Sequence, residues 1–111
     1  MMVVFLDPGQ MTARLELEAP VSVSDGQGGA TVIWQPVAAV WAKIEPVSFV
    51  VTEAASAEVG TVSHRIWIRY RGDVAAGQRL TKGARIFLLK LVRDPDETGR
   101  YLVCQCEEQA P

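Results

Sequence analysis

The segment that most constrains the fold is Thr61 to Leu80, in which a strand pattern runs into a polar turn that contains glycine. Successive side chains on a strand point to opposite sides. Strict alternation therefore places Val62, His64, Ile66, Ile68 and Tyr70 on one face. The opposite face carries Thr61, Ser63, Arg65, Trp67, Arg69 and Arg71. We expect a half-buried strand with an apolar face and an outer face on which three arginines surround a tryptophan.

Three further strand patterns precede this segment. Residues 12–19 alternate between apolar Ala13, Leu15 and Leu17 and an outer face that includes Glu16 and Glu18. The turn chemistry of residues 24–29 predicts a hairpin whose second arm is residues 30–35. Pro36 interrupts this pattern, and residues 37–45 resume it until Pro46, which lacks an N–H for strand pairing.

Two more strands follow the basic segment. Residues 71–77 predict a turn, residues 84–92 an apolar strand with a sandwiched character, and residues 100–107 the last strand after the turn at 94–99. The six short strands favour an all-β fold, a small antiparallel barrel or sandwich. The stretch between the third and fourth strands mixes helix and strand formers, so we expect a long, partly helical or loose protruding loop there. Its candidate functional residues are Val50, Thr52, Glu53, Ser56 and Glu58.

Composition predicts one domain. The chain has 111 residues and is 49% apolar, which suffices for a core of its own. Its formal net charge of -2 argues against a general nucleic-acid binder, although a local arginine face can still meet phosphate. The first residues predict neither a signal peptide nor a membrane anchor.

The candidates for catalysis or metal binding are weak. His64 is the only histidine and falls on the apolar face, which favours a core role over a general base or ligand. Asp94, Asp96 and Glu97 fit turn chemistry better than a calcium loop. Cys104 and Cys106 share a face of the last strand, which predicts buried thiols in a reduced intracellular compartment. We expect no enzyme activity, no cofactor and no bound metal.

Several motifs together resemble a known family. They are the Asp25-Gly26-x-Gly28-Gly29 turn, the segment from Val40 to Pro46, the run from His64 to Arg71, the Gly77-x-Arg79-Leu80 turn, and the closing stretch from Asp94 to Leu102. Their order and spacing over residues 11–108 are similar to those of the head-tail joining proteins of tailed phages, also called head closure or stopper proteins. Relatives occur in prophages and gene transfer agents. Residues 1–10 form an extension beyond the resembling domain, and Met11 is an alternative start.

The resemblance implies a virion component rather than a catalyst. Family members are small β-barrels that assemble as a ring between the portal and adaptor proteins and the tail. They retain the packaged double-stranded DNA without sequence specificity and offer the tail a docking surface. The resemblance thus implies a particle assembled in the bacterial cytoplasm and no membrane. From their small residues and lack of firm periodicity, we also expect residues 47–60 to be mobile in the free subunit and to order in the particle, either as a lumen-facing gate or as a contact with the next ring.

The arginine face has three open interpretations. It can pair with carboxylates of a neighbouring subunit, face DNA phosphates in the channel, or be a solvated strand face. We favour a subunit interface because the chain is net acidic and a lumen that held phosphate tightly would hinder DNA ejection. The interface candidates are Arg65, Trp67, Arg69, Arg71, Glu16 and Glu18, with Arg79, Arg85, Glu107 and Glu108 as further partners.

Two other protein classes compete with this interpretation. One is another neck or tail-end protein, such as a tail terminator. The other is a small nucleic-acid-binding barrel in which Trp67 and Tyr70 stack bases, although alternation places those two on opposite faces. Trp34 and Trp41 fit a core and an interface equally well.

Overall fold

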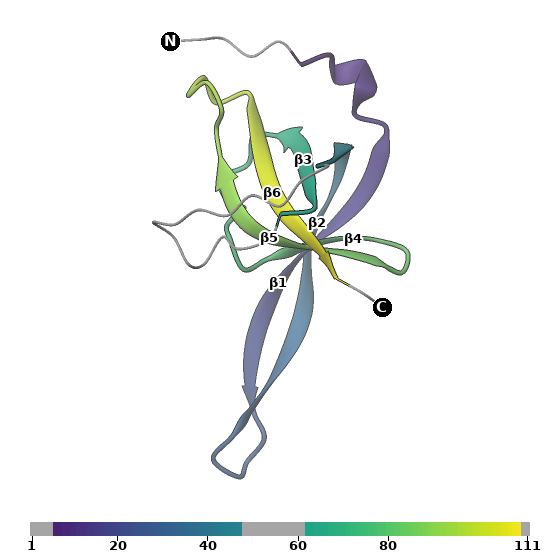
Figure 1. Cartoon of the computed structure of the whole chain (residues 1–111). Coiled ribbons are helices and arrows are strands. Elements are labelled where there is room, and N and C mark those ends of the chain that lie inside the picture. The colour runs from purple at the N-terminus through teal and green to yellow at the C-terminus, as the bar shows by residue number, and fades with distance from the viewer. Residues whose placement is uncertain (1–5, 48–61, 110–111) are drawn as a thin grey trace.

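The computed structural model describes residues 6–47 and 62–109 as a six-stranded antiparallel barrel. A short 3-10 helix, η1 (Pro8–Gln10), precedes the barrel. The strands are β1 (Ala13–Ser24), β2 (Ala30–Pro46), β3 (His64–Arg69), β4 (Arg79–Lys82), β5 (Arg85–Arg93) and β6 (Tyr101–Gln109). They close in the order β1-β2-β3-β6-β5-β4 (Figure 1). The predicted all-β barrel of six strands is confirmed.

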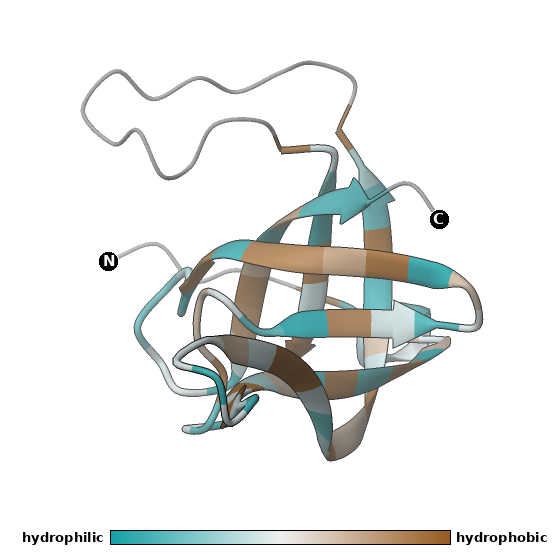
Figure 2. Ribbon diagram, turned by 90° about the horizontal axis from the view of Figure 1, so that it is seen from below, coloured by the Kyte–Doolittle hydropathy of each residue, from teal (hydrophilic) through white to brown (hydrophobic). Residues whose placement is uncertain are grey.

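Every strand contributes side chains to the core inside the barrel. Its fully buried members include Leu15, Leu17, Ile66, Ile68, Leu80, Phe87, Leu89, Cys104 and Cys106. Apolar and polar bands alternate along the ribbons, as period-2 side-chain direction requires (Figure 2). The faces expected for residues 12–19 and for Ile66 and Ile68 are therefore those observed.

The predicted break at Pro36 was wrong, because β2 runs continuously through it. The register shifts here: Leu17 faces Ala38 and Glu18 faces Pro36, which leaves Val37 as an extra residue on β2. A bulge of this kind accommodates a proline that cannot donate to the ladder. Two predicted strands thus form one long strand.

Residues 19–37 form a two-stranded projection, which we call the arm. β1 meets β4 only through Glu16–Glu18, and β2 meets β3 only from Ala42 onward, so beyond these points β1 and β2 pair only with each other in the described part of the chain. Figure 1 shows the arm extending away from the barrel. Its turn matches the predicted hairpin: Gly26 and Gly28 have φ of 79° and 82°, and Asp25 Oδ1 accepts from the N–H groups of Gln27 and Gly29.

The segment expected to be a turn at Gly77 to Leu80 contains the first two residues of a four-residue strand, β4. β4 pairs with both β1 and β5, and Leu80 is fully buried. Gly83 then has φ of 59° in a two-residue connection to β5, as a type II′ hairpin requires. The sixth strand is therefore β4, which replaces the strand lost by the fusion at Pro36.

The expected long loop lies between β2 and β3 and falls in residues 48–61, outside the described residues. In the described ranges, no helix has the length and apolar character to cross a membrane.

Candidate subunit interface

The outer face of β3 is organised by one carboxylate on β2. The register pairs Lys43 with Trp67 and Glu45 with Arg65, so all four side chains share the outer side of the barrel. Trp67 Nε1 donates a hydrogen bond to Glu45 Oε1, and Arg65 Nε lies 3.9 Å from the same oxygen. Lys43 Nζ is 3.5 Å from Glu45 Oε2. Arg65, a member of the predicted arginine face, therefore shares the single carboxylate of Glu45 with Lys43 and Trp67.

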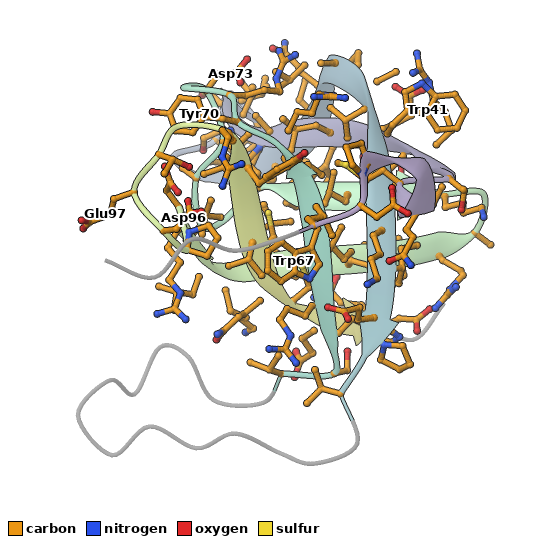
Figure 3. The ribbon with its side chains drawn as sticks, turned by 90° about the horizontal axis from the view of Figure 1, so that it is seen from above. Trp41, Trp67, Tyr70, Asp73, Asp96 and Glu97 are labelled. Atoms are coloured by element: carbon orange, nitrogen blue, oxygen red, sulfur yellow. The ribbon has the colours of Figure 1, made fainter. Side chains whose placement is uncertain are left out.

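A second group lies further along the same outer face. Arg14 faces Trp41 across β1 and β2, and its guanidinium carbon lies 5.0 Å from the Trp41 ring centroid. Arg69 follows one residue beyond Ile68, which pairs with Ala42, so it stands on the other side of Trp41. We call Arg14, Trp41 and Arg69 the Trp41 row. Trp41 is 53% exposed and projects outward (Figure 3).

Two surface hollows meet at the Trp41 row. One of about 420 Å³ is lined by Pro8, Gly9, Met11, Thr12, Trp41 and Arg69. The other, of about 340 Å³, is lined by Arg14, Ala39, Val40, Trp41, Arg69, Tyr70 and Arg71. Of the predicted interface residues, the structure thus brings Arg69 and Arg71 to this place and leaves Trp67 and Arg65 beside Glu45. The contact between Arg14 and Trp41 was not predicted from the sequence, because it depends on the register in which β1 and β2 pair.

Tyr70 does not lie on the core face as expected. β3 ends at Arg69, and Tyr70 is 50% exposed (Figure 3). The next residue, Arg71, makes a bidentate ion pair with Asp73 at 2.9–3.0 Å, and this bond lowers the pKa of Asp73 and raises that of Arg71. Arg71 thus has a carboxylate partner in its own turn.

The two predicted glutamates of β1 differ in their surroundings. Glu18 accepts a hydrogen bond from Arg79 Nε at 2.6 Å. The same guanidinium lies 4.2 Å from the ring centroid of Trp34, at the base of the arm. Glu16 is exposed and has no ion-pair partner among the described residues. Glu16 is therefore available to another molecule, whereas Glu18 fixes the junction of arm and barrel.

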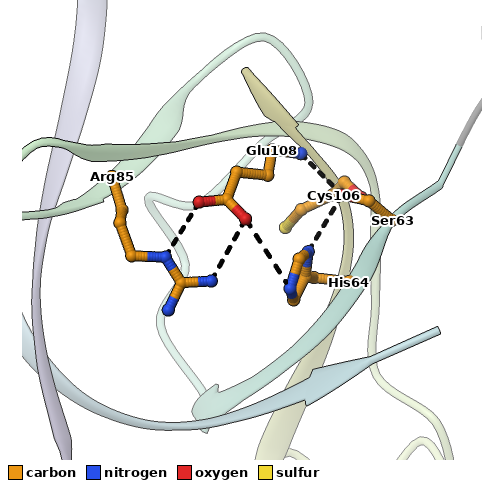
Figure 4. Close-up of polar contacts among 5 residues, drawn as sticks. All are labelled: Ser63, His64, Arg85, Cys106 and Glu108. Carbon is orange, nitrogen blue, oxygen red and sulfur yellow. Dashed lines mark hydrogen bonds and ion pairs between the residues drawn. The ribbon is translucent and has the colours of Figure 1, made fainter. Parts of the chain in front are cut away.

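A polar network closes the end of the barrel where β6 ends (Figure 4). Arg85 donates to both Glu108 oxygens at 2.8 and 3.1 Å, and His64 Nε2 lies 3.8 Å from Glu108 Oε1. Ser63 Oγ lies 2.9 Å from His64 Nδ1 and accepts from the Glu108 N–H. His64 also packs edge-on against Phe87. Burial lowers the pKa of His64 more than Glu108 raises it, and Arg85 lowers it further.

This network fits a structural role. His64 packs edge-on against Phe87 of the core. The carboxylate of Glu108 accepts hydrogen bonds from Arg85, which lower the pKa of Glu108. Lys90 lies 3.9 Å from Glu107 on the neighbouring strand. The carboxylates Glu107 and Glu108, considered as partners for a second subunit, thus lie beside cations of their own chain.

The remaining candidates show turn and core chemistry. Asp94 and Asp96 accept hydrogen bonds from backbone N–H groups of their own turn, and Asp96 also pairs with Arg100. In the described ranges no three metal-ligating side chains gather. Cys104 and Cys106 are buried free thiols, and burial raises the pKa of Cys104 to about 12. The loop candidates Val50, Thr52, Glu53, Ser56 and Glu58 lie outside the described residues.

Together these features define a small closed β-barrel with charged outer faces and a projecting arm. Residues 6–109 match the family model of the phage head completion protein. The chain therefore belongs to the phage head completion protein family, a class of structural virion components. No curated protein sequence matches the chain.

Two solved structures share the fold. A chain of the virion of a native gene transfer agent particle is 32% identical, with a TM-score of 0.65, over 90% of this chain and 96% of that one. A protein of Shigella flexneri 2a solved in solution is 24% identical, with a TM-score of 0.70, over 95% of this chain and 98% of that one. The second likeness concerns the fold alone.

Proposed function

We propose that this chain is a neck component of a phage or gene-transfer-agent particle. It sits between the portal and adaptor proteins and the tail, assembles as a ring, retains packaged double-stranded DNA and provides the docking surface for the tail. The observation that carries this proposal is the family match over residues 6–109, together with 32% identity to a chain of a gene transfer agent virion. The proposed role needs no catalysis.

The outer faces of the barrel support contact with other protein subunits. Arginine and exposed aromatic side chains are enriched at interfaces, and the Trp41 row combines both. Arg65, Trp67, Arg69, Arg71, Glu16 and Glu18 are our proposed ring-interface residues, of which Arg69 and Glu16 lack a charged partner within the described part of the chain. Residues 50–58 remain our predicted channel or docking loop.

The base-stacking alternative gains no support from the side-chain arrangement. Trp67 donates its indole N–H to Glu45, so a carboxylate lies where a nucleic-acid strand would run. A carboxylate repels phosphate. Subunit contact suits this face better than a bound nucleic acid.

Gene deletion with complementation tests the proposal. Particles made without the chain should have heads that lose DNA or lack tails, and the chain should be detected by immunoblot in purified particles from the complemented strain. Purified particles that lack the chain, or tailed and DNA-filled particles from the deletion strain, would contradict it.

A further inference from the structure

We propose that the arm of one copy docks on the Trp41 row of a neighbouring copy. This inference rests on the ring assembly proposed above and assigns the surfaces that make the contact. It concerns the arm and the Trp41 row, neither of which includes Glu45 or the side chains that contact it.

The arm lacks the features of a solvated ribbon. Asp25 is its only charged residue, and its exposed side chains include Val23, Val32 and Ile33. Val32 is the most exposed of these three side chains, at 55%. A two-stranded ribbon is marginally stable in water by itself. The register places Val23 and Ile33 on one face of the arm and Val32 on the opposite face, and exposed apolar side chains on a projection of this kind mark an interaction site. The arm is therefore built to lie against another surface.

The contact uses the side-chain faces of the arm. Among the described residues neither strand of the arm has a partner on its outer edge, and one strand contains Pro20 and the other Pro36. Proline has no N–H to offer a new strand and is a common protection of sheet edges. Pairing of the arm edges with a further strand is thus disfavoured, and packing of its aliphatic side chains is favoured.

The Trp41 row offers the matching surface. Trp41 presents half its area to solvent between two hollows. In the described ranges neither Arg14 nor Arg69 has a carboxylate within ion-pair distance, in contrast to Arg71, Arg79, Arg85 and Arg100. Trp41 can therefore pack against apolar side chains of a partner, while Arg14 and Arg69 can pair with a carboxylate at the end of the same segment.

A second copy supplies such a segment. The large exposed hydrophobic side chains of the described residues fall in two places: the arm, with Val23, Val32, Ile33 and Val37, and the hollows, with Trp41 and Tyr70. The arm tip carries the exposed carboxylate of Asp25, which has no cation partner in the described residues and complements Arg14 and Arg69. A nucleic acid would not match an arm with no positive charge.

The two surfaces are different, so the contact is heterologous. A head-to-tail contact of this kind generates a ring when the rotation between copies closes. Extended backbone rises about 3.3 Å per residue, so the stretch from Ala19 to Asp25 reaches roughly 20 Å from the barrel. That reach allows the arm to cross onto a neighbouring barrel.

Cysteine cross-linking in assembled particles tests the contact. Gln27→Cys at the arm tip and Thr12→Cys in the larger hollow are both exposed positions whose side chains make no described contact. Cys104 and Cys106 should not react with a maleimide, because they are buried and their thiol pKa values are raised. With a short bismaleimide, particles built from the double variant should yield a ladder of multiples of the 12.1 kDa chain.

Two controls make the result specific. Pairing Gln27→Cys with Lys82→Cys, at the exposed end of β4, should give no ladder. Adding Arg69→Glu to the first pair should reduce the ladder at least several-fold. A double variant that enters particles but gives no ladder, or that links only to a different virion protein, overturns the arm assignment and leaves the proposed function standing. Absence of the unmodified chain from purified particles would instead defeat the proposed function.

Discussion

At the scale of single residues, the arginines of the outer face divide by whether a carboxylate lies beside them. Arg65 shares Glu45 with Trp67 and Lys43, and Arg71 is held by Asp73. Arg69 stands next to exposed Trp41 without a carboxylate in the described ranges. Charge reversal at Arg69 should therefore affect contacts with other molecules more than it affects folding.

Arg69→Glu tests this division. We expect the free energy of unfolding of the isolated chain to change by less than about 0.5 kcal/mol, as for most surface substitutions. Particle yield should fall, because a reversed charge meets the partner's carboxylates. Lys82→Glu makes the same charge change away from the hollows and should leave yield unaltered. Chemical denaturation and particle titre measure the two effects, and equal titres for both variants would contradict the expectation.

The network at His64 predicts a pH dependence of stability. The pKa of His64 is lowered in the folded chain, chiefly by burial, so its contribution is fully present above the unfolded value of 6.5 and is lost as pH falls through the folded pKa. Glu108 has a pKa lowered by the Arg85 hydrogen bond, and its contribution is lost at still more acidic pH. Melting temperatures should decline from pH 7.5 to 5.5, and His64→Gln should flatten this decline. An unchanged slope in the variant would refute the histidine assignment.

At the scale of elements, sequence alternation was sufficient for the strands that have one clearly apolar face. It predicted the inward faces of β1 and β3 because Leu15, Leu17, Ile66 and Ile68 recur at period two. It failed at Pro36, where a bulge with Val37 as the extra residue lets β2 continue. In β5, for which both faces were expected to be apolar, a register shift between Leu89 and Leu91 turns Val92 toward the core.

Other elements carried too little signal. β4 spans only four residues, which is too short for an alternating pattern to be recognised. The sequence signal that could have indicated this strand is the Gly83-Ala84 connection, which suits a two-residue hairpin. The Trp41 row could not be predicted either, since it requires the register that brings Arg14 opposite Trp41. Cross-strand neighbours follow from pairing, which a single sequence does not specify.

Leu80→Ala tests whether β4 is an integral part of the barrel. Leu80 is fully buried in the core between β1 and β5, and a truncation of this kind typically costs about 2–5 kcal/mol. Lys82→Ala, at the exposed end of the same strand, should cost less than about 0.5 kcal/mol. Urea unfolding followed by tryptophan fluorescence measures both. Similar, small effects for the two variants would show that β4 does not contribute to the core.

The arm should be less protected than the barrel in the isolated chain. Amides of residues 21–24 and 30–33 belong to a ribbon that pairs with no third strand among the described residues, whereas those of residues 102–106 lie in a strand paired on both sides. Local opening is easier where few buried contacts hold a segment. Hydrogen exchange should be markedly faster in the arm, and equal protection of the two segments would contradict this.

At the scale of the whole molecule, the isolated chain should be a monomer or a weak oligomer. In the part of the chain that the structure describes, large exposed apolar side chains occur in the arm and at the hollows, and each contact offers few of them. Interfaces of this kind gain stability only when several form together on a platform. Sedimentation at micromolar concentration should report a species near 12.1 kDa, and a stable ring without other proteins would disagree.

The central claim is that this barrel is a ring subunit of the particle neck. A cryo-EM map of the neck tests it most directly. We expect the six-stranded barrel, with its arm, repeated around the DNA channel between the portal and adaptor proteins and the tail. A well-resolved neck whose density is accounted for by other proteins, with no place for this barrel, would contradict the account.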